Sequence, residues 1–97
     1  MKAWYTVSYD ITENKARRKI EKLCSTYFQR IQYSVFEGYL SETEFSAFFQ
    51  RLQKLCREIK WNPVTDSILI YRHCSACYAG RKVLGRKVTS SESYLVI

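Results

Sequence analysis

The sequence predicts an α+β fold in which two helices cover one face of an antiparallel sheet. Apolar and polar residues alternate over residues 3–11, which is the pattern of a strand with one buried side. Two later segments, residues 14–28 and 42–59, carry apolar residues at helical spacing. The alternating pattern returns between and after these segments, so strands and helices follow one another along the chain.

The first strand and the first helix each have one apolar face. The apolar side of the strand holds Ala3, Tyr5, Val7, Tyr9 and Ile11. The apolar stripe of the helix holds Ala16, Ile20, Leu23, Cys24, Tyr27 and Phe28. Because basic residues occupy the opposite side of this helix, we expect it to pack on the sheet with its other side in water.

Residues 30–40 return to β character and must supply two strands. Apolar and polar residues alternate up to Val35, but the parity reverses at Phe36 and Glu37. We therefore expect a bulge or a sharp break into a second strand at this point.

The second helix has a clear start and a clear end. Ser41 and Glu44 form a capping box, and an apolar stripe then continues to Ile59. The sequence Trp61-Asn62-Pro63 ends the helix. After it we expect a strand at residues 67–73, a connection at 74–77 and a further short strand at 78–84.

The resulting order is a ferredoxin-like βαββαβ sandwich with an extra C-terminal strand. Residues 1–97 show neither an internal repeat nor a second domain. The last residues are apolar and follow a polar spacer, so we expect a tail strand at 88–97 that pairs with a sheet edge at a dimer interface.

Composition narrows the class of partner and the compartment. The 97 residues carry a formal charge of +7, which favours a polyanion such as nucleic acid, the alternative being a basic solvated surface. No apolar stretch approaches a membrane span, and the N-terminus has no export pattern, so we expect a cytoplasmic protein without membrane contact. We interpret the four cysteines as reduced thiols, with a disulfide of a thermophile left open.

Three groups of residues form a recognisable pattern: Tyr9-Asp10-Ile11 at the end of the first strand, Arg17 in the first helix, and residues 30–38. Together they resemble the CRISPR-associated Cas-two family, small proteins that join the Cas-one integrase in spacer acquisition. The run Gln32-Tyr33-Ser34-Val35-Phe36-Glu37 is the most specific part, and the resemblance covers the whole chain. Phe28-Gln29 departs from the pattern, since many members have Gly after the aromatic residue.

The resemblance implies a homodimer in which the C-terminal strand of each protomer adds to the partner's sheet. It also implies metal-dependent phosphodiesterase activity on RNA or DNA, which some members have and others lack. With Cas-one, the dimer would form a bridge that holds the spacer. The alternatives are a non-catalytic adaptor that binds duplex DNA in the same complex, an RNA-binding ferredoxin-like module unrelated to CRISPR, and a related toxin-type ribonuclease.

Asp10 is the candidate catalytic and metal-binding residue. Its parity places it opposite the buried side chains, at the end of the first strand. Mg²⁺ or Mn²⁺ takes hard oxygen ligands, but one Asp in each chain is few for a nuclease site. A two-fold axis could bring two copies of Asp10 together, as the resemblance also implies. The alternative is that Asp10 caps the turn into the first helix.

The candidate nucleic-acid-binding residues are Tyr9, Arg17, Lys19, Arg30, Arg72, Arg81 and Lys82. Basic side chains bind the phosphate backbone without reading its sequence, and they would bind duplex DNA or single-stranded RNA. The parity of Tyr9 favours packing over phosphate contact. Glu37 is a second candidate carboxylate, but its direction cannot be predicted across the parity break.

Cys74 and Cys77 form a C-x-x-C pair that suggests zinc. One pair lacks the four ligands of a structural zinc site, although two chains could complete it. Simple buried or turn thiols are the alternative. A thioredoxin-like role is disfavoured because we do not expect the pair to open a helix after a strand.

Overall fold

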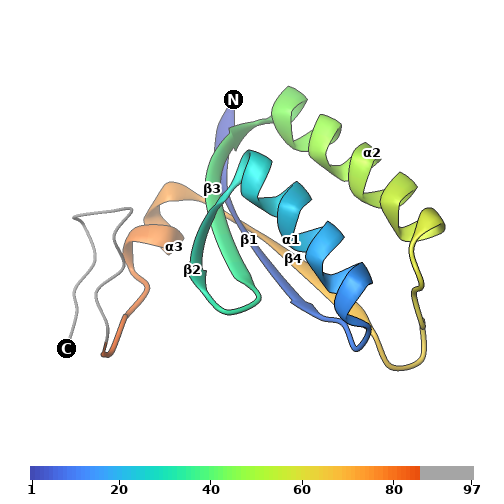
Figure 1. The fold of residues 1–97 in the computed structure, drawn as a ribbon. Helices are drawn as coiled ribbons and strands as arrows, with labels where there is room; N and C mark the ends of the chain where they lie inside the picture. The colour runs from blue at the N-terminus through green and yellow to red at the C-terminus, as the bar shows by residue number, and fades with distance from the viewer. Residues whose placement is uncertain (86–97) are drawn as a thin grey trace.

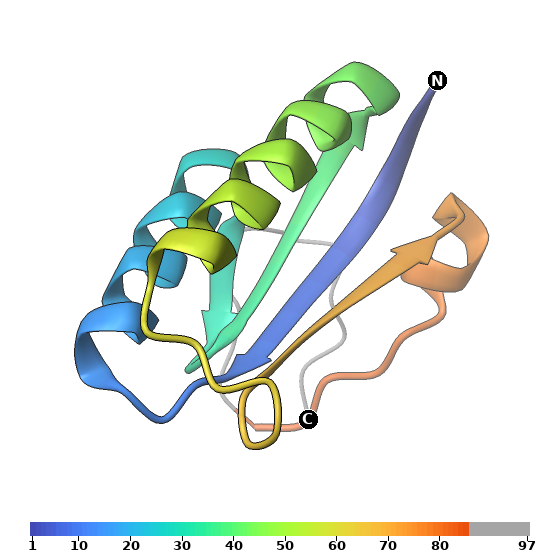
Figure 2. The ribbon, with the colours of Figure 1, turned by 90° about the vertical axis from the view of Figure 1, so that its right-hand side faces the viewer.

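The computed structural model describes residues 1–85, which form one sheet with helices packed on it (Figure 1). The elements in chain order are β1 (Lys2–Asp10), α1 (Asn14–Tyr27), β2 (Gln29–Gln32), β3 (Val35–Ser41), α2 (Glu42–Glu58), β4 (Ser67–His73) and α3 (Ser75–Ala79). The sheet is antiparallel, with the strand order β2-β3-β1-β4. Helices α1 and α2 lie side by side on one face of it (Figure 2). The predicted ferredoxin-like fold class is therefore confirmed.

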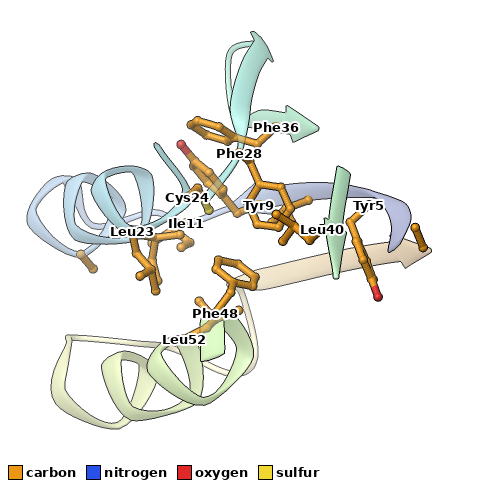
Figure 3. Close-up of a cluster of buried hydrophobic side chains, with 14 residues drawn as sticks. Tyr5, Tyr9, Ile11, Leu23, Cys24, Phe28, Phe36, Leu40, Phe48 and Leu52 are labelled. Carbon is orange, nitrogen blue, oxygen red and sulfur yellow. The ribbon is translucent and has the colours of Figure 1, made fainter. Parts of the chain in front are cut away.

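The core lies between this sheet and the two long helices (Figure 3). Strand β1 sends Tyr5, Val7 and Tyr9 into it, as its alternating pattern predicts. Phe36 of β3 and Phe48 of α2 are fully buried. Both layers contribute large apolar side chains to this core. The helices α1 and α2 therefore cover one face of β1 and leave its other face uncovered by either of them.

The two strands expected within residues 30–40 are present, but the predicted position of the break is wrong. The chain turns at Tyr33 and Ser34, where Ser34 has a φ of 65°, and β3 runs without interruption past Phe36. The register irregularity lies in β2, between Arg30 and Gln32. The parity reverses at Phe36 and Glu37 because both are buried, on opposite faces of the sheet.

The starts of both long helices are fixed by side-chain caps. Glu13 accepts a hydrogen bond from the Ala16 N–H at 2.7 Å and caps α1. At α2 the predicted capping box is confirmed: the Glu44 N–H donates to Ser41 Oγ at 3.1 Å, and the Ser41 N–H donates to Glu44 Oε1 at 2.8 Å.

Gly38 allows close packing between β3 and the end of α1. A Cβ at this position would lie 2.6 Å from Phe28 Cδ1, and Phe28 is itself held edge-to-face by Phe48, with ring centroids 4.7 Å apart. We therefore expect Gly38→Ala to lower the free energy of unfolding by about 1–3 kcal/mol, because the Phe28 ring cannot retreat without disturbing the core.

Urea unfolding measures this effect, and Gly80→Ala is the matched control. A Cβ on Gly80 would lie no closer than 3.5 Å to any atom, and its backbone is in the ordinary helical region. Equal stability losses in the two variants would contradict the packing argument.

Asp66 holds the loop before β4 against the turn after β1. Its carboxylate accepts hydrogen bonds from the backbone N–H groups of Asn62 and Thr12, each at 3.0 Å. These hydrogen bonds, with that from Asn62 the strongest, hold the pKa of Asp66 below its ordinary value. A group whose pKa is lowered by folding stabilises the protein above the pKa of the unfolded chain, and this contribution is lost as the pH falls through the folded-state pKa.

We expect Asp66→Asn to lower the urea midpoint at neutral pH, because the neutral amide is a weaker acceptor for two N–H groups. As the pH falls below about 4, we expect the urea midpoint of Asp66→Asn to decrease less than that of the wild type, because the variant no longer has the carboxyl group that becomes protonated. Unfolding followed by tryptophan fluorescence across this pH range measures both. Urea midpoints that depend on pH in the same way in both proteins would contradict the role of Asp66.

The strand expected at residues 78–84 is absent, and this prediction is wrong. Residues Ser75–Ala79 form the short helix α3, followed by irregular chain with an isolated bridge at Val83. Tyr78 explains the difference, because its ring stacks on Trp4 of β1 with centroids 3.7 Å apart and an interplanar angle of 1°. Trp4 lies on the sheet face opposite α1 and α2, which we name the open face, so α3 covers part of it.

The predicted tail strand at residues 88–97 lies outside the described residues, and so does its pairing at a dimer interface. Within residues 1–85, every helix is too short or too polar to span a membrane.

Candidate metal and nucleic-acid site

Asp10 is exposed at the end of β1, on the open face. It lies opposite Ser67 in the sheet and shares its face with Thr6 and Ser8. The capping role that we considered for Asp10 belongs to other residues: Glu13 caps α1, and Asp66 accepts from the Thr12 N–H. The structure thus leaves the Asp10 carboxylate exposed to solvent, at the end of the central strand β1.

Exposed apolar side chains accompany Asp10 on the open face. In β4, Leu69 is 50% exposed and Tyr71 is 53% exposed. They lie opposite Ser8 and Thr6 in the register, and directly opposed residues of an antiparallel pair point to the same side. The sheet therefore presents a carboxylate beside an apolar patch on its outer strand β4.

The oxygen ligands available to a cation are few in a single chain. Within residues 1–85, no three or more His, Cys, Asp or Glu side chains come together in a way that could hold a metal ion. Asp10 has the hard oxygen atoms that Mg²⁺ prefers, and its exposure leaves room for water and for phosphate oxygens. The donor set therefore fits a divalent cation only if further ligands come from outside the chain.

Arg17 and Arg30 already have partners in the chain. Arg17 donates to the Ile11 carbonyl at 3.1 Å and to Asn14, which fixes the turn from β1 into α1. Arg30 forms an ion pair with Glu21. Both side chains remain near the surface, and their binding to phosphate stays a prediction.

The remaining predicted residues lie on several faces. Tyr9 is buried in the core, where burial is the main cause that raises its pKa. Arg72 is exposed on the helix-covered side of β4, opposite Tyr5. Lys19 and Lys82 are exposed on α1 and after α3. The chain does not bring these residues into one patch, because their elements occupy different faces.

Arg81 is directed towards the protein. Its guanidinium donates to Glu37 Oε1 at 3.0 Å and to Glu37 Oε2 at 3.1 Å, and it lies 3.7 Å from the Tyr78 ring centroid. The Tyr78 hydroxyl donates to Glu37 Oε1 at 2.9 Å. Burial, with the Glu37 carboxylate, raises the pKa of Tyr78. These contacts favour a structural role for Arg81.

The Glu37–Tyr78–Arg81 cluster was missed by the sequence analysis. It joins residues 41 and 44 positions apart, and so no local pattern predicts it. The only sequence signal is a carboxylate inside an otherwise apolar strand, which requires a buried partner. Glu37 is therefore a binding partner of α3 and does not lie beside Asp10 as a second metal ligand.

A basic groove between α1 and α2 was also missed. Its basic lining residues are Lys19, Lys22, Arg51 and Lys54, against the single acid Glu58. The sequence places Lys19 and Lys22 on the wet face of α1, but it does not show that α2 brings two further cations alongside. This groove lies on the helical side of the molecule, away from Asp10.

The fold and its exposed strand-end carboxylate define a small ferredoxin-like domain that presents Asp10 at the end of a central strand. Residues 1–81 match the family model of CRISPR associated protein Cas2, and the chain belongs to this family. The predicted family is therefore confirmed, and an unrelated RNA-binding module is excluded.

Named relatives and solved structures agree with this membership. The chain is 38% identical over 96 residues to "CRISPR-associated endoribonuclease Cas2 1" of Chloroflexus aurantiacus, which covers 96% of this chain and 99% of that protein. It is 37% identical over 84 residues to "CRISPR-associated endoribonuclease Cas2 4" of Rhodospirillum rubrum, which covers 87% of this chain but 64% of that protein. The crystal structure of Streptococcus pyogenes Cas2 at pH 6.5 superposes with a TM-score of 0.67 at 31% identity, covering 84% of this chain and 99% of that one.

Proposed function

We propose that two copies of this chain associate through the open face and that their Asp10 carboxylates together bind Mg²⁺ or Mn²⁺ to hydrolyse phosphodiester bonds in nucleic acid. The observation that carries this proposal is the position of Asp10, which is exposed and shares the open face with Leu69 and Tyr71. The relatives named as endoribonucleases support the activity.

Association through the open face would bury side chains that a single chain leaves in water. Leu69 and Tyr71 are about half exposed, and burying a large apolar side chain fully contributes roughly 1.5–3 kcal/mol. In a two-fold dimer the same patch meets its own copy. Since Asp10 lies opposite Ser67, two residues along β4 from Leu69, its two copies would meet at that interface.

The paired carboxylates would supply oxygen ligands from both chains and leave the remaining positions to water and substrate. The two Asp10 carboxylates would hold a divalent cation, which would supply Lewis-acid polarisation of the phosphodiester and an activated water. The exposed cations Lys19, Arg72 and Lys82 lie on different faces, so each would contact a different part of the nucleic-acid backbone by charge, without selecting a base sequence.

A second candidate function is a non-catalytic adaptor that holds duplex DNA for the Cas-one integrase. The small number of carboxylates favours it, because residues 1–85 contain no ready-made cluster of metal ligands. The same dimer and the same basic side chains would serve both functions.

One assay separates the two candidates. Purified protein is incubated with single-stranded RNA and with duplex DNA in Mg²⁺, in Mn²⁺ and in chelator. The nuclease proposal predicts cleavage that requires the metal. Salt-dependent binding of duplex DNA without cleavage under any of these conditions would overturn it in favour of the adaptor.

A further inference from the structure

Helix α3 directly follows β4 (Figure 1), and the C-x-x-C pair lies at its start, with Cys74 as the N-cap and Cys77 in the first turn. Cys74 caps this helix, and the Cys77 N–H donates to Cys74 Sγ at 3.4 Å. We expected that the pair would not open a helix after a strand, and this prediction is wrong. The pair therefore has the position that a redox role requires. The chain turns there because Cys74 Sγ and the Cys74 carbonyl accept the first helical N–H groups.

The backbone brings the two thiols within reach of one another. The Cys74 carbonyl accepts from the Tyr78 N–H at 3.0 Å, so the first helical hydrogen bond begins at Cys74, whose own backbone is extended as the N-cap of α3. Helical α-carbons three residues apart are about 5 Å from each other. This lies inside the range of roughly 4.4–6.8 Å that a disulfide requires. Both cysteines are free and exposed, so an oxidant can reach either thiol.

We propose that Cys74 and Cys77 form a reversible dithiol–disulfide pair that reacts with small-molecule disulfides such as oxidised glutathione. The structure distinguishes these thiols from the other two cysteines. Cys24 is buried, and burial raises its pKa to about 12. Cys56 is partly buried, and burial raises its pKa as well.

Cys74 is the attacking thiol of the pair. The Cys77 N–H that it accepts lowers the pKa of Cys74, while hydrogen bonding to Cys74 raises the pKa of Cys77. Cys74 thiolate attacks one sulfur of oxidised glutathione, forms a mixed disulfide and releases one glutathione thiolate. Cys77 thiolate then attacks Cys74 Sγ and releases the second. The protein loses two electrons, the glutathione disulfide gains them, and the two thiol protons pass to the two released thiolates.

The disulfide would fix the segment that anchors α3 to the sheet. Tyr78 follows Cys77 directly, and it carries the stacking on Trp4 and the hydrogen bond to Glu37. A covalent link from Cys74 to Cys77 closes the first turn of α3 and restricts the unfolded states of this segment. Oxidation would thereby hold the Glu37–Tyr78–Arg81 cluster in place over the open face.

The test equilibrates reduced native protein with glutathione buffers of increasing oxidised fraction. Trypsin cleaves after Arg72 and Arg81, so one peptide carries both thiols. We expect that peptide to become two hydrogen atoms lighter and to recover its mass with dithiothreitol, while Cys24 and Cys56 stay reduced. Glutathione adducts on both cysteines without an internal bond, or no oxidation of the native protein, would overturn the proposal.

Two variants and a metal arm sharpen the result. In Cys77→Ser, Cys74 should accumulate a glutathione adduct at least about tenfold faster than Cys77 does in Cys74→Ser. This difference should disappear in urea, because the helix start creates it; equal rates in the native proteins would contradict the assignment of Cys74. The same oxidation is run after zinc addition and after chelation. If bound zinc blocks oxidation until a chelator removes it, the two cysteines form a metal site, and the proposal of a redox pair is overturned.

Discussion

Asp10→Asn should lower metal-dependent cleavage by a factor on the order of 100 or more, because it removes the anionic oxygen ligand that the proposed site takes from each chain. The change leaves the fold intact, since Asp10 is exposed and the caps and the turn around it are held by Glu13 and Asp66. Initial rates on RNA and duplex DNA in saturating Mg²⁺ or Mn²⁺ measure the loss.

Glu42→Gln is the matched control for Asp10→Asn. It removes one negative charge from an exposed position in the first turn of α2, beside the end of β1 opposite to Asp10. Its cleavage rate should equal that of the wild type. Cleavage that persists unchanged in Asp10→Asn would exclude Asp10 from the chemistry and return the protein to the adaptor function.

Phe48→Ala should lower the free energy of unfolding by about 3–5 kcal/mol. Phe48 is fully buried, and its ring is edge-to-face with Phe28, the centroids 4.7 Å apart and the planes at 86°. It also meets Tyr27 at 5.5 Å, so the substitution opens a cavity where α1, α2 and the sheet come together. The urea dependence of tryptophan fluorescence measures the change.

Phe49→Ala provides the comparison on the same helix. Phe49 is 39% exposed, and its ring stacks only on Phe45 among the described aromatic pairs. We expect its stability loss to be well under half that of Phe48→Ala, because less apolar surface returns to water. Similar losses in the two variants would mean that α2 does not dock on the sheet through Phe48.

The elements with one clear periodicity could be predicted from the sequence. Strand β1 alternates without interruption, and α2 begins at a capping box, so both were placed within a residue or two. The alternation of β1 also assigned Asp10 to the face away from the core. These features depend on residues close together in the chain, which is why local patterns suffice.

The errors arise where distant residues decide the local structure. Glu37 can be buried because Arg81 and Tyr78, 44 and 41 positions further along the chain, bind its carboxylate. A buried carboxylate reverses the apolar pattern of the strand, and the turn between β2 and β3 was therefore predicted at the wrong position. Tyr78 has the character of a strand residue, but its stacking on Trp4 and the cap at Cys74 place it in a helix. The contacts of Arg81 with Glu37 and of Arg17 with the Ile11 carbonyl likewise cannot be predicted from the local sequence.

Metal binding tests the central claim most directly, because it does not depend on turnover. Mn²⁺ is titrated into the protein by calorimetry while light scattering follows the oligomeric state, for the wild type and for Asp10→Asn. The proposed shared site predicts one ion for every two chains in the wild type, and none at the same concentrations in Asp10→Asn. One ion bound to each chain of a monomer, or undiminished binding in Asp10→Asn, would contradict it.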